Sequence, residues 1–253
     1  MEIRDLLLSC IEKGASDLHL TEKEPPILRV DGKLCRTDFP VLLREDLKKM
    51  IYSVLSNIQK EMFERDLELD FSLALPGMDR FRVNVHIQKG SVEAAFRRVP
   101  LEIPSLESLG LSTVIRDLAR KSNGLVLVTG PTGMGKTTTL AAMVDLINRE
   151  RECLIITIED PIEFIFSNKK SIIKQREIYA DSHSFADSLK RALRQDPNVI
   201  IVGEMRDLET ISTALTAAET GHLVLATLHT PDAPQTIERI IDVFPPHQQQ
   251  QIK

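Results

Sequence analysis

The sequence predicts an α/β protein in which a doubly wound, mostly parallel sheet follows a smaller α+β domain. In the C-terminal half, short unbroken apolar runs alternate with helical segments, the pattern of strands buried on both faces of a parallel sheet. In the N-terminal part, strand-like segments follow one another through tight turns, which is typical of hairpins. The periodicity breaks between these parts. We therefore expect domains at residues 1–99 and 113–253, joined by a linker at residues 100–112.

Composition narrows the classes of function. The chain has 253 residues, 42% of them apolar, which is enough for the cores of one large or two modest domains. The formal net charge of -5 argues against a dedicated nucleic-acid binder, which normally carries a basic face. The 3 cysteines are far apart and form no C-x-x-C pair, so neither a disulfide framework nor a zinc module is indicated.

The chain also lacks membrane signals. Its amphipathic N-terminus has charges inside the apolar pattern, unlike a signal peptide, and no apolar run approaches the roughly 20 residues of a spanning helix. We expect a cytoplasmic protein without direct membrane insertion, which reaches a membrane through partners.

The first domain begins with an amphipathic helix. Short strands are predicted at "SDLHL" and "PILRVDGKL", the latter turning at Asp31-Gly32, a strong hairpin signal. A helix follows over "REDLKKMIYSVL". Three strands then meander over residues 70–99, with turns at Pro76-Gly77 and Lys89-Gly90. The middle strand alternates apolar with polar residues, so one face of the sheet is expected to be solvated or docked on a polar surface.

The linker contains Pro100 and Pro104, which break the periodicity. Beyond it, four buried strands are predicted from apolar runs, namely "LVLV" (125–128), "LIITI" (154–158), "VIIV" (199–202) and "LVLATL" (223–228). Helical segments separate these runs, so the strands are expected to lie parallel.

The sharpest motif is "GPTGMGKT", which runs from Gly130 to Thr137 and fits G-x-x-x-x-G-K-[ST]. It lies between the first apolar run and a helical segment, where backbone N–H groups and the helix dipole can bind a nucleotide's phosphates. Lys136 would reach the β- and γ-phosphates, and Thr137 would bind Mg²⁺. The alternative is a plain glycine turn, but a chance match in a chain of this length is roughly a 1% event at average glycine usage.

Carboxylates follow two of the predicted strands. Glu204 ends "NVIIVGE", at the carboxyl end of a strand, where open α/β sheets bind ligands. It could hold Mg²⁺ through water or orient the attacking water. "TIEDPIEF" places Glu159, Asp160 and Glu163 at the same edge, and carboxylates so close repel one another unless a cation or proton is shared. They are candidates for metal positioning and for a general base, although one of the three is expected to be a mere cap.

Arginines and histidines complete the candidate set. Arg191 and Arg194 lie on one helix face, and Arg206 follows Glu204. Each of these arginines is either part of the solvated surface or a group that neutralises phosphate charge. Because oligomeric ATPases often supply such arginines from a neighbouring subunit, the second alternative favours a ring. His222 and His229 flank the last strand, on the order of 23 Å apart and on opposite faces, so they cannot share a metal ion. His229, at the carboxyl end, is the candidate γ-phosphate sensor, whereas His222 is structural or faces another subunit.

Together these motifs resemble the ATPases of type II secretion and type IV pili, and most of all the twitching-motility (PilT-like) retraction group. "ASDLHL" and "FRVNVHIQKG…AAFRRVP" are similar to that family's N-terminal PAS-like domain, which precedes a RecA-like P-loop ATPase domain. "GPTGMGKTTT" resembles its Walker A motif, "TIEDPIEF" its Asp box, "GEMRDLETI" its Walker B motif and "TGHLVLATLHT" its His box. The four motifs occur in the family's order, and the resemblance covers essentially the whole chain.

The resemblance implies a role for each matching residue. ATP would be bound by a set comprising Gly130, Pro131, Thr132, Gly133, Met134, Gly135, Lys136, Thr137, Thr138 and Arg97. Mg²⁺ would be held by Thr137, Glu204 and Asp160, while Glu204, Glu163, His229, Arg194 and Arg206 would act in hydrolysis. The family works as a homo-hexameric ring with inner-membrane pilus or secretion proteins as partners, so the chain would be peripheral to that membrane and its linker would act as a hinge.

The chain also departs from the family pattern. It has no paired-cysteine module of the kind found in many extension relatives, which favours the retraction branch. It stops at "PPHQQQQIK", where relatives continue into further helices, so we expect a truncated ATPase domain. The missing segment leaves open a nucleotide-binding assembly or regulatory subunit with little turnover. A nucleic-acid translocase is a further alternative, because RecA-like cores also drive helicases, but the acidic charge and the lack of tryptophan disfavour it.

Overall fold

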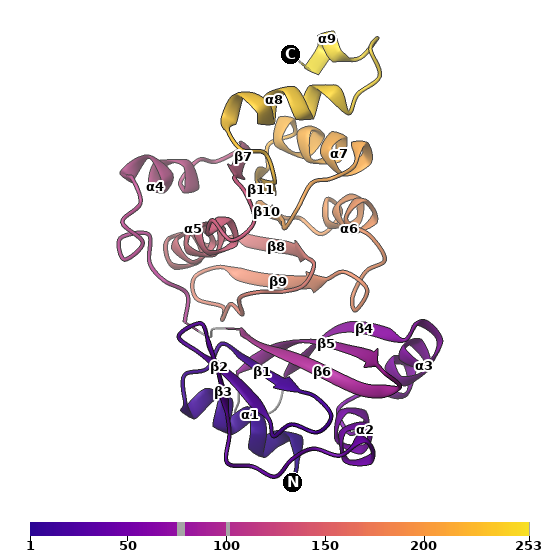
Figure 1. The fold of residues 1–253 in the computed structure, drawn as a ribbon. Coiled ribbons are helices and arrows are strands. Elements are labelled where there is room, and N and C mark those ends of the chain that lie inside the picture. Colours follow the sequence, from indigo (N-terminus) through magenta and orange to yellow (C-terminus); the bar gives the residue numbers. More distant parts are fainter. Residues whose placement is uncertain (75–78, 100–101, 253) are drawn as a thin grey trace. The chain divides into compact units, whose positions relative to one another are not determined.

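The computed structural model describes residues 1–74, 79–99 and 102–252, and the chain divides into two compact units, Met1–Leu101 and Glu102–Lys253. Figure 1 shows a mainly antiparallel ribbon sheet in the first unit and a helix-covered sheet in the second. The predicted turn at Pro76-Gly77 and the predicted linker residue Pro100 lie outside the described residues.

The first unit is a six-stranded sheet in the order β3-β2-β1-β6-β5-β4, in which every neighbouring pair is antiparallel. Its strands are β1 (Asp17–Leu20), β2 (Ile27–Val30), β3 (Lys33–Arg36), β4 (Glu68–Ala74), β5 (Arg80–Gln88) and β6 (Ser91–Val99). Its helices are α1 (Ile3–Glu12), α2 (Arg44–Tyr52) and α3 (Asn57–Asp66). The buried residues of α1 and α2 share one core with the inward side chains of β1, β5 and β6.

The predicted hairpin and meander of this unit are confirmed. Asp31 and Gly32 both have positive φ, which is the geometry of a two-residue turn between paired strands. In β5, Phe81, Val83 and Val85 are buried while the residues between them are partly or fully exposed. The sheet therefore has one face in the core and one polar face, as the alternation predicts.

The second unit is a five-stranded, wholly parallel sheet in the order β7-β11-β10-β8-β9. Its strands are β7 (Gly124–Thr129), β8 (Leu154–Glu159), β9 (Ile172–Glu177), β10 (Val199–Val202) and β11 (Leu223–Leu228). Its helices are α4 (Thr113–Ala119), α5 (Lys136–Glu150), α6 (Phe185–Ala192), α7 (Leu208–Glu219), α8 (Ala233–Asp242) and α9 (Gln249–Ile252).

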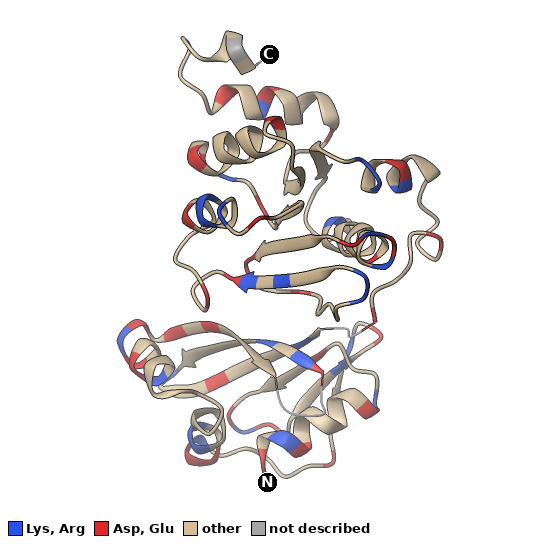
Figure 2. Cartoon of the chain, turned by 180° about the vertical axis from the view of Figure 1, so that it is seen from behind, with Lys and Arg blue, Asp and Glu red and all other residues tan. Residues whose placement is uncertain are grey.

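Helices cover both faces of this sheet, so the predicted doubly wound, parallel architecture is confirmed. One core joins the sheet to α4 and α5, and a second core joins the opposite face to α6, α7 and α8. Every residue of β10 and β11 is buried, which explains their unbroken apolar runs. The edge strand β9 carries the positively charged Lys174 and Arg176, a feature that discourages pairing with another chain. Figure 2 marks the basic and acidic positions along the backbone in blue and red.

The segment before α4 packs on the second unit. Leu106 is buried in the core with α4 and α5, and Leu109 and Leu111 pack against it. Residues 102–112 are thereby anchored to the parallel sheet's domain. In the described parts of the chain, every helix is too short or too polar to cross a bilayer.

Candidate active site

The predicted functional segments of the second unit lie in a row along one edge of its sheet. The phosphate loop follows β7, His229 follows β11, Glu204 follows β10 by one residue and Asp160 follows β8. Because the strands are parallel and adjacent in the order β7-β11-β10-β8, these segments are spatial neighbours although they are far apart in the sequence.

The phosphate loop connects β7 to α5. Gly130, Gly133 and Gly135 have φ values of 147°, 83° and 80°, which only glycine adopts without strain. Gly135 is the residue before α5, and no side chain caps this helix end in the described structure. The first N–H groups of α5 therefore point at the loop with the positive end of the helix dipole behind them, an arrangement that binds phosphate.

The side chains of the loop divide into two groups. Pro131, Thr132 and Met134 are exposed, so they are accessible to a ligand. Thr137 and Thr138 lie half-buried in the first turn of α5. All the predicted nucleotide-binding residues of this motif thus belong to one continuous turn.

Lys136 is the buried cation of the loop, with only 8% of its surface exposed. Its Nζ donates to the carbonyl oxygens of Gly130 at 2.8 Å and Pro131 at 3.1 Å, and lies 3.4 Å from Nδ1 of His229. The ammonium is held at the loop by neutral acceptors, which a phosphate oxygen with its negative charge can replace.

His229 links the loop to Glu204. Its Nδ1 lies 3.3 Å from the Thr132 hydroxyl and 3.4 Å from Lys136 Nζ, while its Nε2 lies 3.4 Å from Glu204 Oε1. A lysine ammonium can only donate, so Nδ1 is the acceptor of this pair. In this tautomer the ring proton is on Nε2, the nitrogen that lies near Glu204.

The backbone around Glu204 is fixed by the two neighbouring strands. The N–H of Gly203 donates to the carbonyl of Ile158 at 2.8 Å, and the Thr227 hydroxyl donates to the carbonyl of Gly203 at 2.5 Å. A Cβ atom on Gly203 would lie 3.1 Å from the Ile158 oxygen and 3.3 Å from Cα of Glu159. Glycine at this position lets β10 approach β8 closely and sets where Glu204 leaves the sheet.

Glu204 is surrounded by cationic and donor groups. Arg206 Nη2 donates to its Oε2 at 2.6 Å; the Glu204 side chain is 20% exposed and that of Arg206 is 76% exposed. Partial burial acts to raise the pKa of Glu204, but the Arg206 hydrogen bond and the electrostatic effects of His229, Arg206 and Lys136 outweigh it and hold the pKa below its ordinary value. Glu204 is thereby kept as a carboxylate.

Replacing Arg206 by methionine is expected to raise the pKa of Glu204, because the group that most strongly favours its charged form is lost while its partial burial stays. A ¹³C NMR titration of the side-chain carboxyls measures this, with the Glu204 signal assigned by its loss in Glu204→Gln. Arg239→Met, which removes an exposed arginine of α8, is the matched control and should leave the titration unchanged. An unchanged midpoint in Arg206→Met would show that this ion pair does not set the charge of Glu204.

The three carboxylates after β8 lie in different surroundings. Glu159 is buried, and burial raises its pKa. Asp160 and Glu163 are exposed. Asp160 lies near enough to Arg206 to help raise the pKa of that guanidinium. Asp160 thus extends the row of charged groups that begins at Lys136, while Glu163 projects from the loop that follows.

The predicted Mg²⁺ ligands fit an ion that arrives with a nucleotide. Among the described residues, no three His, Cys, Asp or Glu side chains form a metal site by themselves. The Thr137 hydroxyl and the carboxylates of Glu204 and Asp160 are hard oxygen donors. Mg²⁺ in nucleotide sites typically takes one or two protein oxygens and completes its shell with phosphate and water, which this donor set allows.

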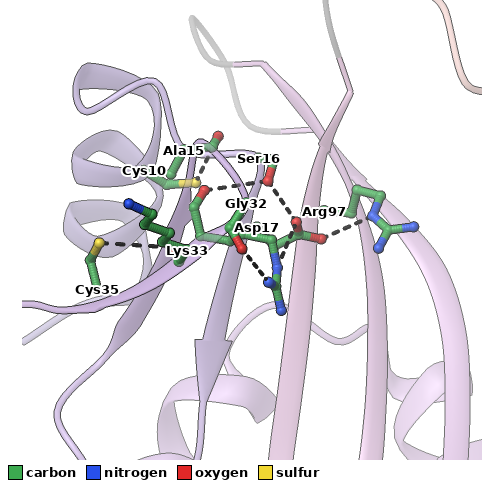
Figure 3. A network of polar contacts seen from close by, with 9 residues as sticks. Cys10, Ala15, Ser16, Asp17, Gly32, Lys33, Cys35 and Arg97 are labelled. Carbon is green, nitrogen blue, oxygen red and sulfur yellow. Dashed lines mark hydrogen bonds and ion pairs between the residues drawn. The ribbon is translucent and has the colours of Figure 1, made fainter.

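Two predicted arginines lie in other surroundings. Arg194 is exposed just after α6. Arg97 belongs to the first unit, where its Nε donates to Asp17 Oδ1 at 2.9 Å and 71% of its side chain is exposed. Figure 3 shows Asp17 between Ser16 and Arg97. Asp17 orients this guanidinium while leaving most of it accessible.

His222 has a local structural role. Its Nδ1 lies 2.9 Å from the carbonyl oxygen of Ala217 and 3.4 Å from the Thr220 hydroxyl, at the C-terminal end of α7. Sequence reasoning left open whether this histidine is structural or faces another subunit, and these contacts account for it within its own unit.

Three polar residues that support the site were missed by sequence reasoning. Gln175 and Glu177 of β9 bind the loop after β8, and Thr157 of β8 donates to Glu159 at the start of that loop. The sequence signal that could have found two of them is the alternation of "IIKQRE", whose inward positions become polar toward the carboxyl end of the strand.

The fold and the site together define a P-loop ATPase. The parallel sheet has helices on both faces, a phosphate loop joins a strand to a helix, and a lysine, a histidine and a carboxylate lie together at the sheet edge. The chain belongs to the type II/IV secretion system protein family, whose model matches residues 2–249.

Individual relatives are similar over the whole chain. The type IV pilus retraction ATPase PilT of Pseudomonas aeruginosa is 48% identical over 253 residues, which is 100% of this chain and 74% of that protein. A crystal structure of the pilus retraction motor PilT with bound ADP matches with a TM-score of 0.96 and 53% identity, covering 100% of this chain and 74% of that one. The ATPase DotB of Legionella pneumophila matches with a TM-score of 0.85 and 31% identity over 98% of this chain and 71% of that one.

Proposed function

We propose that this protein hydrolyses ATP in the presence of Mg²⁺ and that the turnover powers retraction of a type IV pilus. The observation that carries the proposal is the contact of Lys136, His229 and Glu204 beside the phosphate loop. The 48% identity to a pilus retraction ATPase over the full chain supports the pilus as its site of work.

In this proposal the loop binds the phosphates. The N–H groups at the start of α5 bind the β-phosphate, and Lys136 exchanges its carbonyl partners for β- and γ-phosphate oxygens. His229, which is hydrogen-bonded to the loop on one side and lies 3.4 Å from Glu204 Oε1 on the other, responds to the presence of the γ-phosphate. Mg²⁺, held with the nucleotide by Thr137, Glu204 and Asp160, would neutralise charge on the phosphate oxygens.

In the chemical step, carboxylates would act on the attacking water, and arginines would neutralise the charge that develops on the phosphate. Glu204 and Glu163 orient and polarise the attacking water, since both are carboxylates on the nucleotide side of the sheet. Arg206 is already within hydrogen-bonding distance of Glu204 and would turn toward the developing phosphate charge. Arg194 and Arg97 are exposed, which an arginine acting on a nucleotide bound by a neighbouring subunit requires.

We infer that the working form is a homo-hexameric ring in the cytoplasm, attached to the inner membrane through proteins of the pilus or secretion machinery. The exposed arginines support such shared sites. The second unit would be the RecA-like motor domain. The first, with its antiparallel sheet and helices, would be the PAS-like domain. The hinge between them would lie ahead of the part of the predicted linker that Leu106 anchors to the second unit.

The proposal is tested by measuring steady-state Mg²⁺-ATPase activity against protein concentration, with light scattering on the same samples. We expect turnover per subunit to rise as hexamers form, because exposed arginines then complete neighbouring sites. Turnover that is independent of concentration in a monomer would reject the ring. Nucleotide binding with turnover well below about 1 per second would favour an assembly or regulatory subunit, and stimulation by DNA would favour a translocase.

The biological role is tested in a bacterium whose own retraction ATPase gene has been deleted. Expression of this chain should restore twitching zones on agar, and the Glu204→Gln variant should not. Restored ATPase activity in cell extracts without twitching would separate the enzymatic function from pilus retraction.

A further inference from the structure

The loop that carries Glu163 has no helix or strand of its own. It runs from residue 160 to residue 171, between β8 and β9. Glu163 is exposed, whereas its neighbours Ile162 and Phe164 are buried. An irregular loop can hold a catalytic group in one place only if other groups bind its backbone.

Side chains of β9 supply such bonds. Glu177 Oε2 accepts from the backbone N–H of Ile162 at 3.0 Å. Gln175 binds the loop twice: its Nε2 donates to the carbonyl of Phe164 at 2.8 Å, and its Oε1 accepts from the N–H of Phe166 at 2.9 Å. The strand thus acts as a template for the loop on both sides of Glu163.

Glu159, the last residue of β8, connects this template to Glu163 itself. Its carboxyl accepts from the Thr157 hydroxyl at 2.5 Å and from Gln175 Nε2 at 3.1 Å, and the backbone N–H of Glu163 lies near enough to favour the charged form of this carboxyl. Glu159 is only 9% exposed. Burying a carboxyl is costly, and an apolar side chain of the same size would avoid that cost, so its presence points to a need for its acceptor oxygens.

We propose that Glu159 is a positioning residue, which through the backbone N–H of Glu163 and through Gln175 fixes the loop so that the Glu163 carboxylate can act on the attacking water. The inference deepens the proposed ATP hydrolysis and rests on it for its catalytic part. The positioning part concerns the folded loop alone and can be measured without turnover.

The first measurement is amide hydrogen exchange over residues 160–171 in Glu159→Met, which keeps the side-chain length and removes every acceptor. Exchange of the Ile162 to Phe166 amides is expected to be about tenfold faster or more than in the wild-type chain, because lost bonds let the loop open more often. Asp145→Asn is the matched control: it also alters a buried carboxylate of this unit, one that binds Lys169 and Arg149 rather than the backbone of 162–166. Unchanged exchange in Glu159→Met overturns the inference.

The second measurement is a double-mutant cycle in ATP turnover. Glu159→Met should lower kcat about 10- to 100-fold at nearly constant KM, since a shift of about 1 Å in a reacting group has an effect of that size. In the Glu163→Gln background it should lower kcat no further. An equal loss in both backgrounds overturns the inference, because a general structural defect acts whether or not Glu163 is intact.

Two outcomes separate this inference from the proposed function. If the wild-type chain does not turn over ATP but Glu159→Met still loosens the loop, the proposed function fails and the positioning stands. If Glu163→Gln turns over like the wild-type protein, ATP hydrolysis stands and the catalytic purpose of Glu159 is overturned. Gln175→Leu, which loses the bonds to Phe164 and Phe166, carries the same two measurements if Glu159→Met does not fold.

Discussion

Lys136→Ala is expected to lower kcat/KM for ATP about 100- to 1,000-fold, the range observed when one positioned donor to a developing negative charge is removed. Lys136 is the buried cation of the phosphate loop, and its ammonium already lies against the loop carbonyls of Gly130 and Pro131. Alanine removes the charge that would neutralise the β- and γ-phosphates. Phosphate release gives the rate, and calorimetric titration with ADP should show weaker binding in the variant.

The fold should survive this change, because residues 131–135 of the loop are exposed and water can enter to replace the lysine ammonium at the freed carbonyls. Lys170→Ala is the matched control, since it removes an exposed lysine whose backbone N–H alone bonds to α5. It should leave both activity and nucleotide affinity unchanged. Wild-type turnover in Lys136→Ala would contradict the assignment of this loop as the phosphate site.

Glu204→Gln is expected to lower kcat about 100- to 10,000-fold while ATP still binds. Glutamine has the same shape, so the backbone at Gly203 and the contacts with β8 and β11 are preserved. It cannot accept a proton as a carboxylate does, and its amide cannot satisfy both Arg206, which donates to Oε2, and His229, which lies 3.4 Å from Oε1. A strong loss in kcat at nearly constant KM is the signature of a group that acts in the transition state.

Glu209→Gln provides the comparison for Glu204→Gln. Glu209 is an exposed carboxylate of α7 that also pairs with a cation, Lys190, and an exposed pair of this kind contributes at most about 1 kcal/mol to stability. Its turnover should equal that of the wild-type chain. If Glu204→Gln kept more than about a tenth of wild-type kcat, the main role in activating water would pass to another carboxylate at this edge, with Glu163 the first to test.

Much of the fold could be predicted because parallel strands buried on both faces leave unbroken apolar runs. The runs at 154–158, 199–202 and 223–228 coincide with β8, β10 and β11 to within one residue. β9 was missed because its inward side chains Gln175 and Glu177 are polar, since they bind a loop backbone instead of the core. A strand that serves as a template for a loop lacks the apolar signal by which strands are recognised.

Helix α3 was missed for a different reason. Only Phe63 of its residues is buried, so its apolar periodicity is faint. The sequence does carry a start signal: Ser56 and Gln59 form a capping box, each side chain bonding to the other's backbone N–H. Capping chemistry would have located this helix where periodicity could not.

The members of the active site were predictable one by one, but their contacts were not. Motifs and strand ends indicated Lys136, Glu204 and His229 as functional. That His229 bridges the other two depends on β11 lying between β7 and β10, and this order follows from the pairing of whole strands. No local feature of the sequence states which strands are neighbours.

The sheet order has a consequence for the newly made chain. β7, which leads into the phosphate loop, pairs in the described sheet with β11. Residues 124–129 therefore gain this strand partner only after residues 223–228 have been synthesised. At 5–20 residues per second, a ribosome needs roughly 5–20 s to make the intervening segment. During that interval an emerging chain presents the glycine-rich turn without the strand that aligns it, and His229 has yet to be synthesised. Until β11 has been made, the chain lacks His229 and the strand that joins β7 to β10, so we expect ATP turnover to begin only once β11 has joined the described sheet.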